Sequence, residues 1–450
     1  MNKFLLYVSV VASLGGFLFG FDSGVISGAE GAIQNEFALS SFWHGLIISG
    51  ALIGTIIGVF TAGRPSDRWG RRPVLWAMAI LFLISAVGCA FTPMDAKLGP
   101  HLLGWFRFIG GLAIGGVSVV VPLYIVEIAP GNRRGLLVGL NQFNVVFGIL
   151  ASYITNYLVA KYMPQVDPRI VWRVMLGVEC LPIVVFMALL VTIPESPRWL
   201  VRAGRMDEAQ DILRRTGVAD AAVTVGEIRT TLAAAQGGRD VPLFQRKYLK
   251  PILLAFFIAL FNQTSGINAI NYYAPRIFGM IFGEGSSLVS LVGTMGMGTV
   301  NLIFTAIAFA VIDRVGRRVL ILTGSAAMIL MHGLVAWQLS LAQPNAAIAV
   351  CGIFGFMAFF ALSSGACLWV YISEVFPNAV RAKGQAFGCF IHWFLCTLIS
   401  WAFPWAAERA GSATFGFFAL MMVCQFVWAA FFMPETKGGT TEDIEKRLGF

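Results

Sequence analysis

A carboxylate stands inside the first long apolar run of the chain, where a membrane helix is expected. Asp22 lies within residues 15–28, Gly-Gly-Phe-Leu-Phe-Gly-Phe-Asp-Ser-Gly-Val-Ile-Ser-Gly. An ionisable group is expensive to bury in a bilayer, so it is a functional candidate that requires a partner. Arg107 in the fourth apolar run is expected at a similar depth, and Glu179 in the sixth run slightly deeper. These three residues form the candidate charged site.

One arginine between two acids suits the transfer of a proton. The positive charge of Arg107 favours the ionised form of Asp22, whereas burial favours the protonated form. A conformational change that separates the two side chains would therefore load or release a proton. The alternative is a structural ion pair that joins two helices, and the residues alone leave both interpretations open.

The elements that must position these charges are membrane helices. The chain has 450 residues, of which 58% are hydrophobic and 12% are charged, and its mean hydropathy is +0.78. Soluble domains carry about 25% charged residues. Twelve apolar runs are long enough to cross a bilayer, the first at 4–28 and the last at 412–433. The sequence therefore predicts an all-α membrane protein that crosses the bilayer many times.

The charges outside the apolar runs alternate between loops. The net charge is +9, and Lys and Arg gather in every second loop, as they do on the cytoplasmic side of membrane proteins. Both termini are therefore expected in the cytoplasm, and no basic stripe with interleaved aromatic residues indicates a nucleic-acid partner. The seven cysteines lie in apolar runs without metal-ligand spacing. Since no nucleophile–base set or phosphate loop is found either, we expect no metal, no cofactor and no enzyme activity.

The loop motifs of the first half of the chain return in the second half. Three motifs recur at nearly one spacing: Asp67-Arg68-Trp69-Gly70-Arg71-Arg72 as Asp313-Arg314-Val315-Gly316-Arg317-Arg318, Glu127-x-x-Pro130-x-x-x-Arg134 as Glu374-x-x-Pro377-x-x-x-Arg381, and Pro194-Glu195 as Pro434-Glu435. Such a repeat indicates internal duplication, and two parallel halves with a site between them are a transporter architecture. The expected parts are an N-terminal six-helix half at 1–193, a cytoplasmic helical linker at 194–248, a C-terminal six-helix half at 249–434 and a short cytoplasmic tail at 435–450.

The combined motifs resemble those of the sugar porter family of the major facilitator superfamily. Besides the repeated motifs, the resemblance rests on Arg107 and on three longer sequences: Pro194-Glu195-Ser196-Pro197-Arg198-Trp199-Leu200, Gln263-x-x-Gly266-Ile267-Asn268 and Pro434-Glu435-Thr436-Lys437-Gly438. It covers nearly the whole chain, and is strongest with bacterial proton-coupled monosaccharide symporters. It implies a major facilitator fold with twelve transmembrane helices in two pseudosymmetric six-helix halves. It also implies a monomer in the lipid of the inner (plasma) membrane, with a sugar and a proton as its ligands.

Uncharged polar residues in the middle of apolar runs are the candidate sugar ligands. An amide offers two donors and an acceptor to sugar hydroxyl groups, and five amides match sugar-binding positions of the family: Gln142, Asn262, Gln263, Asn268 and Asn301. The three in the seventh run cannot share one face of an ideal helix, and a break at Ser265-Gly266 would let them converge. For each amide, the alternative role is a hydrogen bond between helices.

Aromatic rings suit the apolar face of a sugar. The resemblance assigns Tyr272, Trp369 and Trp393 to the aromatic wall and gate of the family, and ordinary aromatic packing is the alternative. His392 stands beside Trp393 where relatives commonly carry Asn or Gln. It is expected either to replace an amide toward a sugar hydroxyl or to be a hydrogen-bonded core residue.

Two further positions depart from the family pattern. Asn262 replaces a glutamine that is one methylene longer, and Gly365-Ala366 replaces a Gly-Pro pair before Trp369. The loss of the proline leaves open whether the tenth helix bends there. Because both positions would line the pocket, glucose, galactose, xylose, arabinose and inositol all remain candidate sugars.

Acids and arginines alternate at repeated positions of the expected cytoplasmic loops. The positive-inside rule explains the arginines but not the acids. We expect ion pairs that close the inner side in the outward-open state and separate in the inward-open state. The predicted gate residues are Asp67, Arg71, Glu127, Arg134 and Glu195 in the first half, and Asp313, Arg317, Glu374, Arg381 and Glu435 in the second.

The resemblance also favours proton coupling, because proton-coupled members carry Asp at the position of Asp22 whereas uniporters tend to carry Asn. The sequence thus predicts proton-coupled uptake of a monosaccharide by alternating access. A uniporter on the same fold is the leading alternative, and a sugar sensor without transport is a second. The repeat spacing relates Gly20 and Asp22 to Gly266 and Asn268. It therefore predicts that residues 15–28 are the first half's counterpart of the helix break in the second half.

Overall fold

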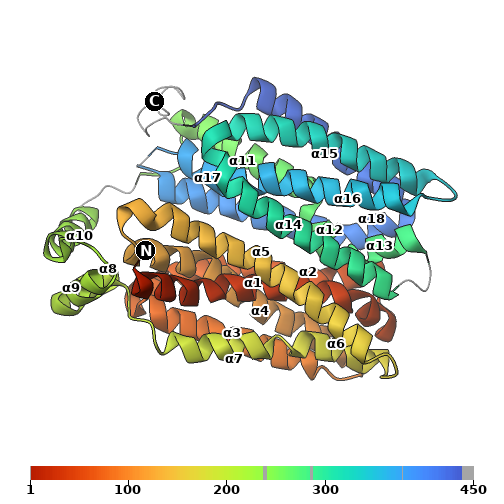
Figure 1. Cartoon of the computed structure of the whole chain (residues 1–450), viewed down its shortest axis with the longest axis horizontal. Coiled ribbons are helices and arrows are strands. Elements are labelled where there is room, and N and C mark those ends of the chain that lie inside the picture. The colour runs from red at the N-terminus through yellow and green to blue at the C-terminus, as the bar shows by residue number, and fades with distance from the viewer. Residues whose placement is uncertain (1, 237–240, 284–286, 378, 438–450) are drawn as a thin grey trace.

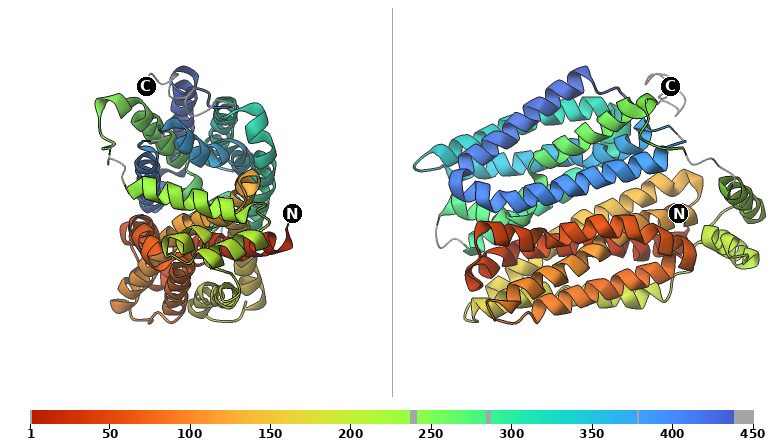
Figure 2. Two further views of the ribbon diagram at one scale, coloured as in Figure 1. Left: turned by 90° about the vertical axis from the view of Figure 1, so that its left-hand side faces the viewer. Right: turned by 180° about the vertical axis from the view of Figure 1, so that it is seen from behind.

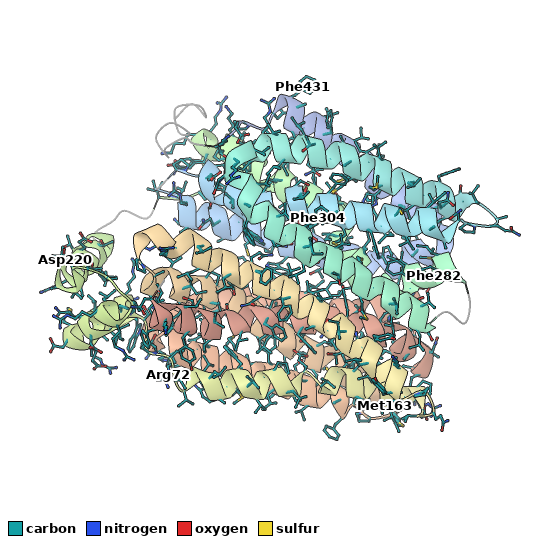
Figure 3. All side chains as sticks on the ribbon, viewed as in Figure 1. Arg72, Met163, Asp220, Phe282, Phe304 and Phe431 are labelled. Atoms are coloured by element: carbon teal, nitrogen blue, oxygen red, sulfur yellow. The ribbon has the colours of Figure 1, made fainter. Side chains whose placement is uncertain are left out.

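Two bundles of helices lie side by side in the computed structural model, which describes residues 2–236, 241–283, 287–377 and 379–437 (Figures 1 and 2). Three shorter helices project from one end of the first bundle. We call this the linker end of the molecule and the other the opposite end. Arg72 lies at the linker end, and Met163 and Phe282 lie at the opposite end (Figure 3). Most of the expected tail, residues 438–450, lies outside the described residues.

The first bundle contains helices α1 to α7, and the sixth expected span is divided by a turn at 178–179. Its helices are α1 (Lys3–Glu36), α2 (Ser41–Trp69), α3 (Arg71–Ala90), α4 (Leu98–Ile128), α5 (Arg134–Tyr162), α6 (Pro168–Gly177) and α7 (Cys180–Leu190). The linker follows with α8 (Pro197–Arg202), α9 (Met206–Arg215) and α10 (Ala221–Gln236).

The second bundle begins at Leu249 and contains two interrupted spans. Its helices are α11 (Leu249–Thr264), α12 (Ile267–Tyr272), α13 (Ala274–Phe282), α14 (Ser287–Val315), α15 (Arg317–Ser340), α16 (Ala346–Phe360), α17 (Ala366–Val375) and α18 (Arg381–Phe431). A π-helical turn at Ala361–Gly365 joins α16 to α17.

Eleven helical segments of the described chain are long and apolar enough to cross a membrane. The last of these, α18, has 51 residues and contains a kink at Ala410, where φ is −159° and ψ is 72°. A single straight helix of that length would be far longer than a bilayer is thick. Counting the two arms of α18 separately gives the twelve spans predicted from the sequence.

In each half, one glycine ends the second helix and begins the third. Gly70 has a φ of 103°, and its counterpart Gly316 has a φ of 106°. Residues other than glycine avoid this left-handed region. A Cβ atom on Gly316 would also lie 2.7 Å from a carboxylate oxygen of Glu435, and one on Gly70 would overlap Glu195. The repeated motif therefore forms the same turn in both halves.

The first helix differs from the prediction. The expected break at Gly20 is wrong, because α1 is continuous from Lys3 to Glu36 and extends eight residues beyond the expected end at residue 28. Four of its glycines, at 16, 20, 24 and 28, instead face α5: a Cβ atom on Gly20 would overlap the Val145 carbonyl, and one on Gly28 would lie 2.5 Å from the Asn156 side chain. Small residues allow membrane helices to approach this closely. The equivalent glycines Gly20 and Gly266 thus serve close packing in α1 and a turn in the second half.

Candidate functional site

The predicted charged pair is formed. Arg107 on α4 donates to the Asp22 carboxylate on α1, with 2.5 Å between Nη1 and Oδ1, and both side chains are at most 3% exposed. Within the described chain, Asp22 Oδ2 and Arg107 Nε have no hydrogen-bond partner. The pair is therefore buried, yet one carboxylate oxygen remains available to a proton.

The second acid of the predicted relay lies close by. Glu179 is 3% exposed and occupies the turn between α6 and α7. It is near enough to Asp22 and Arg107 to interact with both charges, and its Oε1 has no hydrogen-bond partner among the described residues. The turn places this carboxylate near the pair, and Glu179 forms no ion pair among the described residues. The three residues thus share one buried polar region of the first bundle.

The predicted break of the seventh span is present. Gly266 adopts a φ of 83° between α11 and α12, and the three amides of this span converge around it. Gln263 donates to Asn262 Oδ1 at 3.1 Å and accepts from Asn268 Nδ2 at 2.8 Å. The convergence follows from the break, because an unbroken helix would place these residues on different faces.

Asn262 also contacts the tenth span. Its Nδ2 donates to the Ser364 carbonyl at 3.1 Å, within the π-helical turn. Gln425 on α18 donates to the Ser364 hydroxyl at 3.0 Å. A π turn widens a helix and frees a carbonyl group, so the tenth helix deviates here although Gly365-Ala366 lacks the proline. In this conformation Asn262 has the interhelical role that the sequence left as its alternative.

His392 belongs to the same cluster. Its Nδ1 lies 3.0 Å from Gln263 Nε2. Because an amide nitrogen only donates, this ring nitrogen is the acceptor and the imidazole is neutral. The ring lies 4.8 Å from that of Trp369 and 5.1 Å from that of Trp393. The cluster therefore combines amides, an imidazole and aromatic faces.

The aromatic residues extend the cluster to the first bundle. Trp393 on α18 packs against Phe19 on α1 at 5.7 Å between ring centroids. Trp369 is 38% exposed, whereas Tyr272 is buried. Tyr272 on α12 is close enough to Arg107 and Asp22 to interact with them electrostatically. Tyr272 therefore brings α12, the helix that also carries Asn268, close to the charged pair of the first half.

Two predicted ligands are less closely tied to this cluster. Gln142 is half-buried on α5 and forms no hydrogen bond within the described chain. Asn301 on α14 is buried, and its Oδ1 accepts from Thr305 at 3.4 Å within the same helix. Both side chains retain free hydrogen-bonding capacity.

The predicted gate residues form two matching clusters at the linker end. Arg71 binds Glu127 at 2.7 Å and Asp67 at 3.2 Å. In the second half, Arg317 binds Glu374 and Asp313, each at 3.0 Å. Each of these four pairs lies within one half.

The remaining gate residues complete the two clusters. Glu195 accepts from the backbone N–H of Arg71 at 2.9 Å, and Glu435 accepts from that of Arg317 at 3.0 Å. Arg134 and Arg381 each donate to a backbone carbonyl five residues earlier, at 3.3 Å. The repeat in sequence is therefore a repeat in contacts.

The two glutamates differ electrostatically. Burial raises the pKa of Glu195 above its usual value, although three backbone N–H groups that donate to it oppose the shift. Burial acts on Glu435 in the same direction. There, however, four backbone N–H donors outweigh it and hold the pKa of Glu435 below its usual value. The pKa values of the two glutamates at equivalent positions are thus shifted in opposite directions.

An ion pair between the halves lies at the opposite end, and the sequence analysis missed it. Arg276 on α13 donates to Glu30 on α1 at 2.8 and 3.2 Å and lies 3.4 Å from Glu408 on α18. Gln34 accepts from Arg276 and donates to Glu408 at 3.3 Å. His44 on α2 is buried, with Nε2 3.3 Å from Glu30 Oε2. We call these five residues the outer cluster.

The outer cluster had a signal in the sequence. Glu30 and Arg276 are 246 residues apart, which is the separation of Asp67 and Asp313. They are therefore equivalent positions of the repeat that carry opposite charges. Two further contacts close the same end, because Ser41 donates to Glu408, and Trp401 donates to the Phe42 carbonyl at 3.1 Å.

Comparison with known proteins agrees with this geometry. The family model "Sugar (and other) transporter" matches residues 8–448. The arabinose-proton symporter of Bacillus subtilis is 38% identical over 449 residues, covering 98% of this chain and 95% of the symporter.

Solved structures show the same fold. The inward open conformation of the xylose transporter XylE from E. coli has a TM-score of 0.87 at 32% identity, covering 98% of this chain and 99% of the other. The proton:xylose symporter XylE bound to 6-bromo-6-deoxy-D-glucose gives 0.81 at 32% identity, with full coverage of both chains. The predicted major facilitator fold is confirmed, and the chain is a multi-pass membrane protein that belongs to the sugar (and other) transporter family.

Proposed function

We propose that the protein takes up a monosaccharide together with a proton by alternating access. The observation that carries this proposal is the buried Asp22–Arg107 pair. One of its carboxylate oxygens has no hydrogen-bond partner among the described residues, and Tyr272 from the other half lies nearby. Relatives named as arabinose-proton and xylose-proton symporters support it. A change in the protonation of Asp22 would act on α12, which carries both Tyr272 and the proposed sugar ligand Asn268.

The amide cluster suits a sugar as its cargo. Gln263 accepts a hydrogen bond from Asn268 and donates one to His392. Sugar hydroxyl groups both donate and accept, so they can replace these contacts without leaving an amide unpaired. The rings of Trp369 and Trp393 offer an apolar face. Gln142 and Asn301, from two other helices, are the further proposed ligands, and the sugar leaves chemically unchanged.

We infer that the linker end faces the cytoplasm, as the excess of Lys and Arg on that side favours. Both termini and the linker 194–248 then lie inside, and the outer cluster faces the exterior of the inner (plasma) membrane. Closure by the outer cluster and the higher TM-score to an inward open relative support an inward-facing state. In the outward-facing state, the gate residues of the two halves would pair with each other. We propose a monomer.

The test is uptake into proteoliposomes that contain the purified protein, with and without an inward proton gradient. A symporter concentrates a labelled sugar, and an uncoupler abolishes the concentration. Equilibration that is insensitive to the uncoupler identifies a uniporter instead. Sugar binding without flux in either condition identifies a sensor. Competition with unlabelled arabinose, xylose, galactose, glucose and inositol then identifies the cargo.

A further inference from the structure

A histidine outside the cluster described above lies in the interior of the second bundle. His332 on α15 is fully buried. Its ring lies 4.2 Å from that of Phe356, 5.7 Å from that of Phe418 and 6.0 Å from that of Phe415. A polar ring in such apolar surroundings is costly unless it satisfies a specific partner. None of the roles proposed so far uses it.

The partner of this histidine is the helix break. His332 Nε2 lies 3.0 Å from the backbone carbonyl oxygen of Ser265, the residue directly before Gly266. A carbonyl at the end of a helix loses its usual intrahelical donor, and no water replaces that donor in a membrane interior. Because a carbonyl only accepts, the ring donates from Nε2.

The break is held from a second side by Phe418. A Cβ atom on Gly266 would lie 2.5 Å from the ring of Phe418, which also packs beside His332. The Ser265 hydroxyl donates to the Asn262 carbonyl at 2.6 Å. Among the described residues, the backbone of the turn has one polar contact from another helix, and that contact comes from His332.

The direction of α12 decides whether the sugar amides meet. Gln263 precedes the break and Asn268 follows it, and their side chains are joined at 2.8 Å. A rotation of α12 about Gly266 would separate them. We propose that His332 is a positioning residue, which donates to the Ser265 carbonyl and so fixes the angle at which α12 presents Asn268 toward Gln263. The inference rests on the proposed function, because it assigns these amides to the sugar.

The test compares two substitutions that differ in the donor. His332→Gln retains an N–H group near the position of Nε2, whereas His332→Leu retains apolar volume without a donor. Met328→Ala serves as a packing control, because Met328 is fully buried one turn earlier on α15. Sugar affinity is measured by quenching of tryptophan fluorescence in the purified protein. Amide hydrogen exchange of residues 266–270 is measured without sugar, together with the unfolding temperature.

We expect His332→Leu to weaken sugar binding about tenfold, which corresponds to one lost hydrogen bond, and to accelerate exchange at residues 266–270. His332→Gln should stay within about threefold of the wild type in both. Met328→Ala should lower the unfolding temperature and leave sugar affinity unchanged.

Three results would overturn the proposal. One is equal behaviour of the Leu and Gln variants, and another is a loss of stability in His332→Leu at unchanged affinity and exchange. The third is a loss of proton-driven accumulation at unchanged affinity, which would make His332 a proton carrier. If the wild type binds no sugar, the proposed function fails, and the exchange data still decide whether His332 holds the break.

Discussion

The two oxygens of the Asp22 carboxylate have different surroundings. Oδ1 accepts from Arg107, whereas Oδ2 has no hydrogen-bond partner in the described chain. A proton on Oδ2 would leave the contact with Arg107 in place while removing the negative charge that holds it. Protonation of Asp22 can therefore weaken its attraction to Arg107 before the hydrogen bond between the two side chains is broken.

Asp22→Asn should abolish sugar accumulation while sugar exchange stays within about threefold of the wild type. The amide keeps the size of the side chain and can still accept from Arg107 through its oxygen, but it cannot take up a proton. Proton-driven uptake and counterflow in proteoliposomes measure the two properties. Asp211→Asn on the exposed face of α9 is the control and should change neither. A variant at Asp22 that still concentrates sugar would refute the coupling role.

Glu195 and Glu435 should affect the pH dependence of stability in opposite directions. The pKa of Glu435 is lowered in the folded protein, so its contribution is present above the unfolded pKa and is lost as the pH falls through the folded value. The pKa of Glu195 is raised, so its contribution is present below the unfolded pKa and is lost as the pH rises through the folded value.

Unfolding temperatures measured from pH 4 to pH 8 in detergent test this difference. Relative to the wild type, Glu195→Gln should gain stability as the pH rises, because the charge that burial disfavours is gone. Glu435→Gln should lose stability over the same interval. Equal slopes for the two variants would show that the equivalent positions have equivalent environments.

At the scale of helices, the sequence predicted the break at Gly266 between α11 and α12, but it did not predict that α1 is continuous. Amides at 262, 263 and 268 could converge only if the helix broke at Gly266, so side-chain chemistry identified the turn. In α1 the same reasoning transferred the break to Gly20 by repeat symmetry, and it failed. Glycine serves both a left-handed turn and a close helix contact, and only the neighbouring helix decides between them. For Gly20 that neighbour is α5.

Gly20→Ala should destabilise the protein by about 1–3 kcal/mol, as overpacking does in well-packed cores. The new methyl group would overlap the Val145 carbonyl, which cannot move without shifting α5. Gly31→Ala in the same helix is the matched control, because a Cβ atom there has nothing within 4 Å. That substitution should be neutral or stabilising, since alanine is the better helix former. Equal destabilisation of both variants, measured by thermal unfolding, would contradict the packing account.

At the scale of the whole molecule, the two halves are joined at the opposite end by the ion pairs of the outer cluster. The sequence predicted gate pairs at the linker end from repeated acids, and the described pairs there, such as Arg71–Glu127 and Arg317–Glu374, lie within single halves. The pairing between halves in an outward-facing state stays a prediction. The outer cluster was missed because Glu30 and Arg276 lie outside the family motifs. They share the repeat spacing of 246 residues, but they carry opposite charges and so do not form a repeated motif.

Glu30→Gln should shift the protein toward an opening at this end by about tenfold, because Arg276 loses the buried one of its two carboxylate partners and keeps only the more exposed Glu408. Spin labels at Met94 and Arg409, measured by double electron–electron resonance, report the distance across the opposite end. The double reversal Glu30→Arg with Arg276→Glu should restore closure at least in part. If Glu30→Gln leaves the distance distribution unchanged, the ion pair does not hold the closed state.

The position of this pair has a consequence for the history of the chain. Glu30 and Arg276 are equivalent in the two halves and touch each other, so their contact lies near the axis that relates the halves. A residue on the axis of a symmetric dimer meets its own copy, and two identical charges there repel. An acid can face a base on such an axis only when the two halves differ in sequence, as the diverged halves of one polypeptide do. The Glu30–Arg276 ion pair can therefore form in a chain that contains both halves, but it cannot form in a homodimer of one six-helix half.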